Sequence, residues 1–221
     1  MIKKVSLPVT PRLTEADLPE ESLSEMELES EIDLQNLKMG GVATGDALGG
    51  RFSQILFASA RLSAVSWRRA HFEDSLWRNC DLANTDAREV YASRVEMVGC
   101  RGVGLVAPES NWRDAVFRDG NFSLAQWRFA KFERARFEGC DLREADFQNA
   151  DLRGVVFRDC DLRGAQFSFS RLQNADLRSC QTEEITIEAT ALKGLIVSPM
   201  QAAQFATILG LQVQWNDGEG L

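Results

Sequence analysis

A period of five residues runs through most of this chain and restricts the folds that it can adopt. When residues 51–200 are divided into blocks of five, the second position of almost every block holds a large apolar side chain. From Phe52 to Val197 there are 30 such positions, and 25 hold Phe, Trp, Leu, Met, Ile or Val. The position two residues earlier holds a small side chain in 26 of 30 cases. A period of five fits neither an α-helix nor a simple strand, so it indicates a repeat architecture.

Strand geometry converts this period into a shape. Residues two apart in an extended segment point the same way, so the small and the large position both point inward and the residue between them points outward. The other two residues of each block turn a corner. The five cysteines all occupy the small position, and their sequence numbers all differ by multiples of twenty: Cys80, Cys100, Cys140, Cys160 and Cys180. This spacing predicts four sides per turn, with turns stacked about 4.8 Å apart.

Several blocks carry a recognisable signature. The runs at 145–149 (Ala-Asp-Phe-Gln-Asn), 150–154 (Ala-Asp-Leu-Arg-Gly) and 160–164 (Cys-Asp-Leu-Arg-Gly) resemble the A(D/N)LXX motif of the pentapeptide-repeat family. The resemblance covers about three quarters of the chain. It implies an all-β solenoid, a right-handed quadrilateral parallel β-helix with a short C-terminal capping helix; the handedness is taken from the family.

The pattern divides the chain into three expected parts. We expect an acidic N-terminal leader at 1–30, the pentapeptide-repeat β-helix at 31–197, and a capping helix with a tail at 198–221. Residues 1–36 carry nine acidic and three basic side chains. From Thr14 to Glu31 two alternatives stay open, a solvated and partly helical segment or a disordered acidic tail.

The phase of the repeat predicts the coils in detail. Blocks in phase can be followed back to Ile32, Leu37 and Val42, which gives about eight coils. The large position is under-filled within 87–110, where it holds Ala, Ala, Met, Gly and Ala. Because protein cores are densely packed, we predict a bulge or a narrowed coil there, compensated by larger residues at the small position and by Trp112.

The C-terminal segment carries the signals of a capping helix. Residues 198–201 (Ser-Pro-Met-Gln) predict an N-cap, a proline at the first helical position and a capping box, and Gly210 predicts the end of the helix. A short strand is expected at 211–215. Two roles stay open for this end, a lid over the last coil of a monomer or, as the resemblance implies, a homodimer interface. The candidate residues are Met200, Phe205, Leu209 and Trp215.

The sequence predicts no catalytic, cofactor-binding or metal site, and we therefore expect a protein that is not an enzyme. Stacked cysteine side chains in one column point in parallel, which suits neither a disulfide nor a tetrahedral metal site, so we expect five buried, reduced thiols. The single histidine, His71, falls in an outward position without a nucleophile beside it. The aspartates in the outward position are expected to stabilise the corners.

Charge restricts the partners. The net charge of −8 argues against direct nucleic-acid binding and against anionic membranes, and no apolar run reaches the roughly 20 residues that cross a bilayer. The N-terminus lacks an apolar signal core, so we expect a cytoplasmic protein. Residues 37–221 are nearly balanced, with 24 acids and 22 bases. Charges one coil apart alternate in sign, as in the column Asp74–Arg94–Asp114–Arg134.

Two functions from different classes follow from these features. The first is a rigid, non-catalytic protein-interaction module whose partner the sequence does not identify. The second is implied by the resemblance, since some relatives bind DNA gyrase and confer quinolone resistance through a DNA-like acidic surface. A DNA mimic needs a long stripe of one sign, and the alternating columns do not predict such a stripe.

A candidate contact patch stands out within the repeats. Among the phenylalanines of the repeats, only Phe129 and Phe169 do not occupy a large position; each lies two residues after one. Because the length of two coils separates them in the sequence, they are expected on one face, about 10 Å apart, with Asn149 between them. They would anchor a protein partner or, alternatively, fold against the corners of their own coils.

Overall fold

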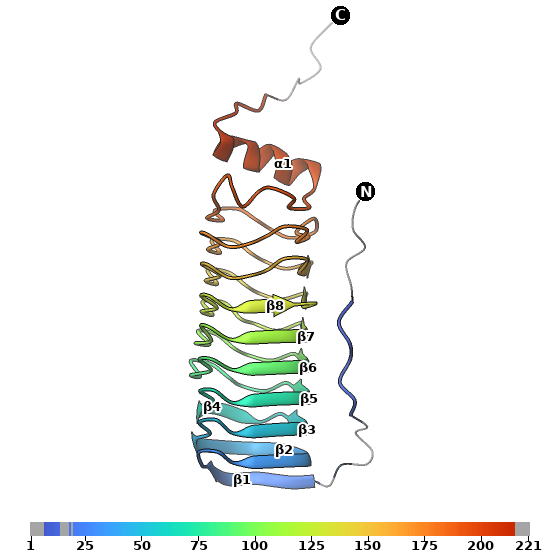
Figure 1. The fold of residues 1–221 in the computed structure, drawn as a ribbon, viewed down its shortest axis with the longest axis vertical. Coiled ribbons are helices and arrows are strands. Elements are labelled where there is room, and N and C mark those ends of the chain that lie inside the picture. Colours follow the sequence, from blue (N-terminus) through green and yellow to red (C-terminus); the bar gives the residue numbers. More distant parts are fainter. Residues whose placement is uncertain (1–6, 14–17, 19, 215–221) are drawn as a thin grey trace, which may run out of the picture.

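The chain forms a four-sided parallel β-solenoid, as the computed structural model of residues 7–13, 18 and 20–214 shows (Figure 1). The main sheet has the strand order β1-β2-β3-β5-β6-β7-β9-β10, while β4 pairs with β2 and β8 with β7. Every pairing is parallel. The strands are β1 (Glu20–Leu28), β2 (Asp33–Asp46), β3 (Arg51–Ala58), β4 (Arg61–Ser66), β5 (His71–Arg78), β6 (Tyr91–Val98), β7 (Asn111–Arg118), β8 (Lys131–Glu133), β9 (Arg136–Glu138) and β10 (Val156–Arg158).

The predicted coil length is confirmed by the strand register. His71 pairs with Tyr91 and Tyr91 with Asn111. Isolated bridges continue this spacing on other sides, for example from Asp141 to Asp161. About seven turns stack in this way, where the phase of the repeat predicted eight. Each side has five residues, and two of them form the corner. Many sides are therefore too short for a strand and hold a single β-bridge.

Aromatic stacks fill the centre of the solenoid. Phe117, Phe137 and Phe157 stack with ring centroids 4.5 and 5.1 Å apart. A second stack on another side contains Trp127 and Phe147, whose ring centroids are 5.2 Å apart. These separations suit offset stacking of aromatic rings and are close to the spacing between neighbouring strands. The large side chains of each side therefore stack from coil to coil in an apolar column.

Aspartates stabilise the corners, as predicted. The Oδ1 atoms of Asp141, Asp161 and Asp176 each accept a hydrogen bond from the backbone N–H two residues later, at 3.1 to 3.2 Å. This is the Asx-turn geometry that favours Asp at a corner. In these three cases the residue two positions on is an arginine, and its guanidinium also binds the same carboxylate.

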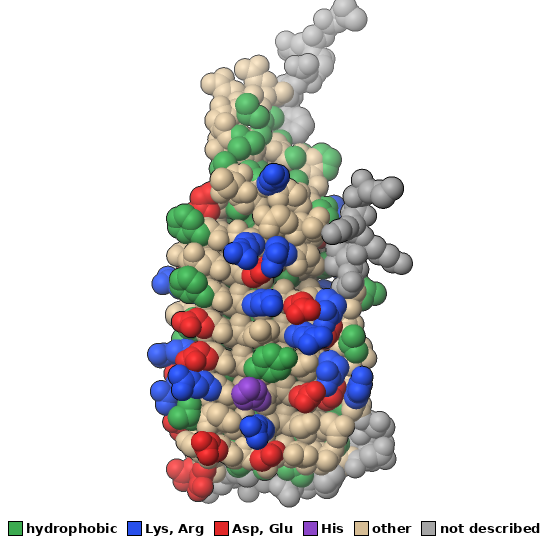
Figure 2. All heavy atoms as spheres, viewed as in Figure 1, with side chains coloured by type: hydrophobic (Ala, Val, Ile, Leu, Met, Phe, Trp, Pro, Cys, Tyr) green, Lys and Arg blue, Asp and Glu red, His purple; other side chains and the backbone are tan. Residues whose placement is uncertain are grey.

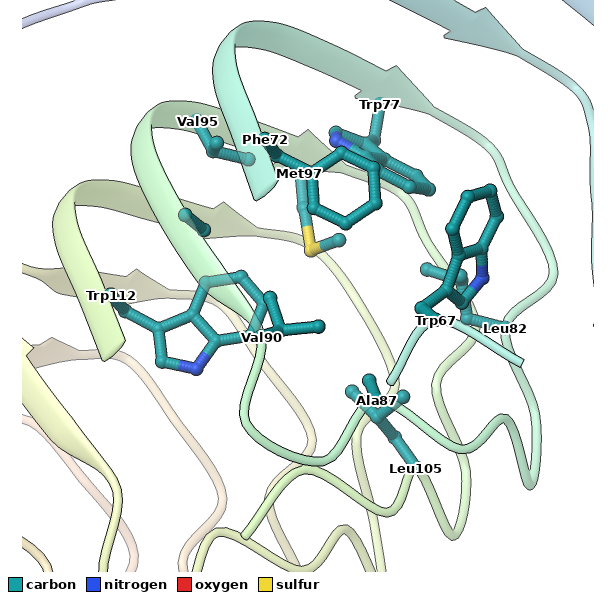
Figure 3. Close-up of a pocket in the computed structure, with 11 residues that line it drawn as sticks. Trp67, Phe72, Trp77, Leu82, Ala87, Val90, Val95, Met97, Leu105 and Trp112 are labelled. Atoms are coloured by element: carbon teal, nitrogen blue, oxygen red, sulfur yellow. The ribbon is translucent and has the colours of Figure 1, made fainter. Parts of the chain in front are cut away.

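The under-filled coil is not bulged, so that prediction is wrong. The register from β5 through β6 to β7 is unbroken, and the residues at all five large positions point inward and are buried. The expected compensation by Val90, Val95, Leu105 and Trp112 is confirmed, since all four are buried and line a residual apolar cavity of about 20 Å³ (Figure 3). The coil keeps its shape because backbone hydrogen bonds to the coils on either side fix it. The volume that the small side chains do not fill remains as this cavity.

The first turn departs from the predicted phase. Asp33 pairs with Arg51 and Met39 with Phe57, an offset two positions shorter than the regular coil. Met39 is therefore buried at a large position, while Leu37 pairs with Ile55 at a small position. The phase assigned to Ile32, Leu37 and Val42 is corrected accordingly. Residues Glu20–Leu28 lie within the expected leader but form β1, which pairs with β2 and so belongs to the solenoid.

The C-terminal helix follows its predicted signals. Helix α1 (Pro199–Ala206) has Ser198 as N-cap with a complete capping box to Gln201, and a 3₁₀ turn (Thr207–Leu209) ends at Gly210 with φ 76°. The Gln201 side chain is buried and its Nε2 donates to two carbonyl oxygens of the last full coil at 2.7 and 2.9 Å. Residues 211–214 form no strand, which corrects that expectation.

Candidate interaction surface

Two phenylalanines protrude from one corner of the solenoid. The side chains of Phe129 and Phe169 are 60% and 73% exposed, whereas the phenylalanines at large positions are buried. Both lie at the corner residue with a left-handed backbone, at φ 59° and 60°. Asn149 lies between them in the same column with φ 60°. The structure therefore places all three residues of the candidate patch where the sequence predicted them, and the rings do not pack into their own coils.

The backbone at this corner gives the two rings no structural advantage. A left-handed conformation costs an L-residue roughly 1–2 kcal/mol, and Asn or Gly bears it best. A bulky residue in this conformation is unusual and its ring here is mostly in water, so neither backbone nor burial favours phenylalanine. The same left-handed conformation recurs at other corners, for example at Gln54, Arg69 and Glu109, so the repeat sets it. What distinguishes Phe129 and Phe169 is that they place a large apolar side chain in water.

One exposed apolar residue near this surface was missed from the sequence. Leu124 is half exposed and has φ 59°, at the neighbouring corner of the coil that carries Phe129. Like Phe129 it lies two residues after a large aromatic position, Phe122 in this case. A search for any large apolar residue two positions after a large position, and not for phenylalanine alone, would have identified Leu124 from the sequence.

The C-terminal end presents the second apolar surface. Phe205 is buried against the last coil, so it caps the core. Met200 and Leu209 are exposed, as is Leu211 beyond the helix. A shallow groove of about 140 Å³ lies beside α1, lined by Leu192, Leu195, Val197, Ala202, Phe205, Ala206 and Leu209. The fourth candidate of this set, Trp215, lies outside the described residues.

The surface charges are paired locally. Arg94 donates to both carboxylate oxygens of Asp74 at 2.7 and 2.8 Å, and Arg134 binds Asp114 with the same two distances. These pairs confirm the alternating column. Figure 2 shows the face with the single histidine, where acidic and basic side chains are interspersed. On this face the charges form no stripe of one sign.

Most cysteines of the column are buried away from solvent. Four thiols are buried and Cys180 is only partly buried, so the expectation of five buried thiols holds for four. Hydrogen bonding to Cys160 and burial raise the pKa of the Cys140 thiol. For Cys160, the hydrogen bond with Cys140 lowers the pKa, but the bond with Cys180 and burial outweigh it and raise the pKa to about 12. Thiolates are therefore suppressed at Cys140 and Cys160, whereas a hydrogen bond with Cys160 lowers the pKa of Cys180.

The described residues provide little for catalysis or metal binding. Among residues 7–13, 18 and 20–214, no group of three or more His, Cys, Asp or Glu is arranged to hold a metal ion. The His71 ring lies 5.8 Å from the Tyr91 ring on an open face. No helix of the described part of the chain is long and apolar enough to span a bilayer.

Comparisons with known proteins concern the family and the fold. A family model described as the pentapeptide repeat region matches residues 70–138 and 130–204. Full-length QnrB1, a plasmid-mediated fluoroquinolone resistance protein, is 19% identical, with 87% of this chain and 100% of that chain covered and a TM-score of 0.47. HetL, a pentapeptide repeat protein involved in heterocyst differentiation regulation in the cyanobacterium Nostoc sp. strain PCC 7120, is 21% identical, with 72% and 71% covered and a TM-score of 0.43. No curated protein matches the sequence.

Proposed function

The chain belongs to the pentapeptide-repeat family, and from that premise we propose that it is a non-catalytic, rigid module that binds a protein partner. The observation that carries this proposal is the pair of exposed phenylalanines, Phe129 and Phe169, held in a left-handed backbone conformation at one corner. Aromatic residues, phenylalanine included, are enriched at protein interfaces relative to the rest of the surface.

The solenoid suits such a role because it presents its corner without rearrangement. Each coil is held by hydrogen bonds to the next, for example from the Phe129 N–H to the Gln148 carbonyl oxygen at 3.0 Å. The two rings stand two coils, or about 10 Å, apart, a separation set by the ladder. A preorganised pair of anchors loses little conformational entropy on binding.

Affinity capture with matched variants tests the proposal. The variant Phe129→Asn/Phe169→Asn gives both corner positions the residue that Asn149 already provides in this column, so the fold is preserved. The control Asp159→Asn introduces the same residue at a left-handed position of a different corner. We expect the unmodified chain and the control to retain a protein that the double variant loses. If all three retain the same proteins, the patch is not the binding surface.

DNA gyrase is the partner that the family resemblance suggests, and a direct assay decides it. QnrB1 is a fluoroquinolone resistance protein, while the locally paired charges of this chain do not favour a DNA-like surface. Gyrase supercoiling would be measured with and without a fluoroquinolone, in the presence of the unmodified chain. Protection from the drug would identify gyrase as the partner. No protection would leave the interaction module with a different protein partner.

We propose that the C-terminal end forms a homodimer. The exposed Met200, and the apolar groove beside α1 that the exposed Leu209 lines, support this proposal. Light scattering after gel filtration should give twice the mass of the chain, and Leu209→Glu should halve it. A mass of one chain for the unmodified protein would show that α1 only caps the core.

A further inference from the structure

The N-terminal segment lies along one corner of the solenoid. Residues 7–13 run beside the stacked coils in an extended path (Figure 1). The backbone N–H of Val9 donates to Asp114 Oδ1 at 3.2 Å, and the N–H of Arg12 donates to Asp74 Oδ1 at 2.9 Å. The segment therefore runs antiparallel to the direction in which the coils are stacked. We call residues 7–13 the strap and Asp74, Arg94, Asp114 and Arg134 the corner rail.

The repeat of the strap matches the repeat of the rail. Pro8 and Pro11 are three residues apart, and each directly precedes one of the two N–H donors. A polyproline II helix has three residues per turn and advances about 9.3 Å per turn. Asp74 and Asp114 are two coils apart, which is about 9.6 Å at the strand spacing. One N–H per turn of such a segment thus meets every second coil.

The contact combines backbone N–H groups and prolines with two further side chains, Leu13 and Arg12, whose positive charge acts on Asp74. Pro8, Pro11 and Leu13 are half-buried, whereas Leu7, Val9 and Arg12 are exposed. Proline fixes its own φ at about −65° and disfavours a helical residue before it, so the segment is stiffened in the extended form. Any segment with prolines in this spacing offers the same two donors.

The rail is prepared to accept N–H donors. Asp74 and Asp114 are buried, and each is held by the arginine of the next coil through both carboxylate oxygens. This pairing fixes each carboxylate, while Oδ1 retains capacity for one further hydrogen bond. The next residue of the column beyond Arg134 is Gly154, which has no acceptor side chain. The rail therefore offers two carboxylates, matched to two donors.

We propose that the corner rail is a docking site for a proline-rich, extended segment of a partner protein, with prolines every third residue, and that the strap occupies this site until such a segment displaces it. This inference adds a partner class to the proposed interaction module and rests on that proposed function. It concerns a different corner from Phe129 and Phe169, so the two can fail separately.

A peptide in trans tests the docking site. In the full chain, Val9→Pro/Arg12→Pro removes the two N–H donors and keeps the extended backbone, which opens the rail. We expect a fluorescein-labelled peptide of residues 7–13 to bind this variant at least tenfold more tightly than the unmodified chain, where the strap competes at high effective concentration. A peptide carrying the same two prolines lacks the donors and should not bind.

Variants of the rail supply the control. Adding Asp74→Asn/Asp114→Asn to the opened chain should weaken peptide binding at least tenfold, while adding Asp119→Asn at another corner should leave it unchanged. In the unmodified chain, an excess of peptide with Arg12 replaced by Gln should speed trypsin cleavage after Arg12 by releasing the strap. No binding to the opened chain, binding that ignores the two aspartates, or unchanged cleavage would each overturn the proposal.

Discussion

Cys180 is the cysteine whose environment differs most from its column. It is only partly buried, and the hydrogen bond from Cys160 lowers the pKa of its thiol despite partial burial. Reaction with a thiol reagent requires both access and thiolate, and the other four lack access. We expect the native protein to react rapidly at one site, and Cys180→Ser to abolish that reaction. Rapid modification at a second site, detected by mass spectrometry, would contradict the sealed column.

The corner aspartates predict how stability depends on pH. Hydrogen bonds from Arg143, Arg163 and Arg178 hold the pKa values of Asp141, Asp161 and Asp176 below their ordinary value, despite burial. A lowered folded-state pKa stabilises the fold above the unfolded value of about 3.9, and this contribution is lost as the pH falls through the folded value. The thermal midpoint should hold from pH 7 to about 5 and fall below about 4. A constant midpoint down to about pH 3 would show that these pairs do not matter.

At the residue scale, the five-residue period predicted which side chains point outward, but it did not predict the left-handed backbone conformation at the corners. The outward direction of Phe129 and Phe169 followed from counting, because the period fixes which residues face water. The left-handed corner was not predicted, since most residues found there, such as Asn, Asp and Gly, also occur in ordinary turns. The contacts of Val9 and Arg12 were not predictable because the strap lies outside the repeat, and its proline spacing by itself does not identify which corner it contacts.

At the element scale, the under-filled coil within 87–110 shows that backbone hydrogen bonds between coils keep the coil in register, while the small side chains leave a cavity in the core. Ala92 is fully buried and lines the 20 Å³ cavity. Ala92→Val should therefore raise the free energy of unfolding by about 0.5–1 kcal/mol. Gly102→Ala is the contrasting change, because its Cβ would lie 2.6 Å from Phe122 Cδ1, and it should cost about 1–3 kcal/mol. Denaturant unfolding measures both. Equal effects of the two substitutions would contradict the location of the cavity.

Gln201 shows what a terminal cap must do. Its Nε2 donates to the carbonyl oxygens of Leu177 and Cys180, and its Oε1 accepts from the Ser198 N–H. The Leu177 oxygen also accepts from the Cys180 N–H, whereas the Cys180 oxygen takes from Gln201 the bond that the next coil provides to Cys140 and Cys160. Gln201→Leu should lower the free energy of unfolding by about 1–3 kcal/mol, because the Cys180 carbonyl oxygen loses its donor. Gln212→Leu on the exposed tail should have no effect. A loss below about 0.5 kcal/mol for Gln201→Leu would show that the cap depends on Phe205 alone.

The register of the first turn could not be predicted from the sequence pattern. Ile32, Leu34, Leu37 and Met39 are all apolar, so the sequence there fits two phases equally well. Only the pairing of β2 with β3 decides between them, through an offset shorter than the regular coil. The capping helix was predictable because its signals are local, whereas register depends on a partner strand that the local sequence does not specify.

At the scale of the whole molecule, the described residues form a rod with a capped C-terminal end and locally paired charges on its sides. β1 extends the ladder at the N-terminal end and α1 covers the C-terminal end, where an open edge would otherwise pair with other chains. On the face shown in Figure 2, acidic and basic side chains are interspersed without a dominant sign. Against this background, the apolar corner formed by Phe129 and Phe169 is a local exception, and binding is the role that we propose for it.

The most direct test of that role is the thermal unfolding of Phe129→Asn/Phe169→Asn. Asn tolerates the left-handed corner better than Phe, and the two rings contribute little burial, so the fold gains or loses almost nothing. A change of 1 kcal/mol shifts the midpoint of a chain of this size by about 2–4 °C. We predict a midpoint equal to or above that of the unmodified chain. A fall of more than about 4 °C would mean that the rings are packing groups, and would contradict the binding surface.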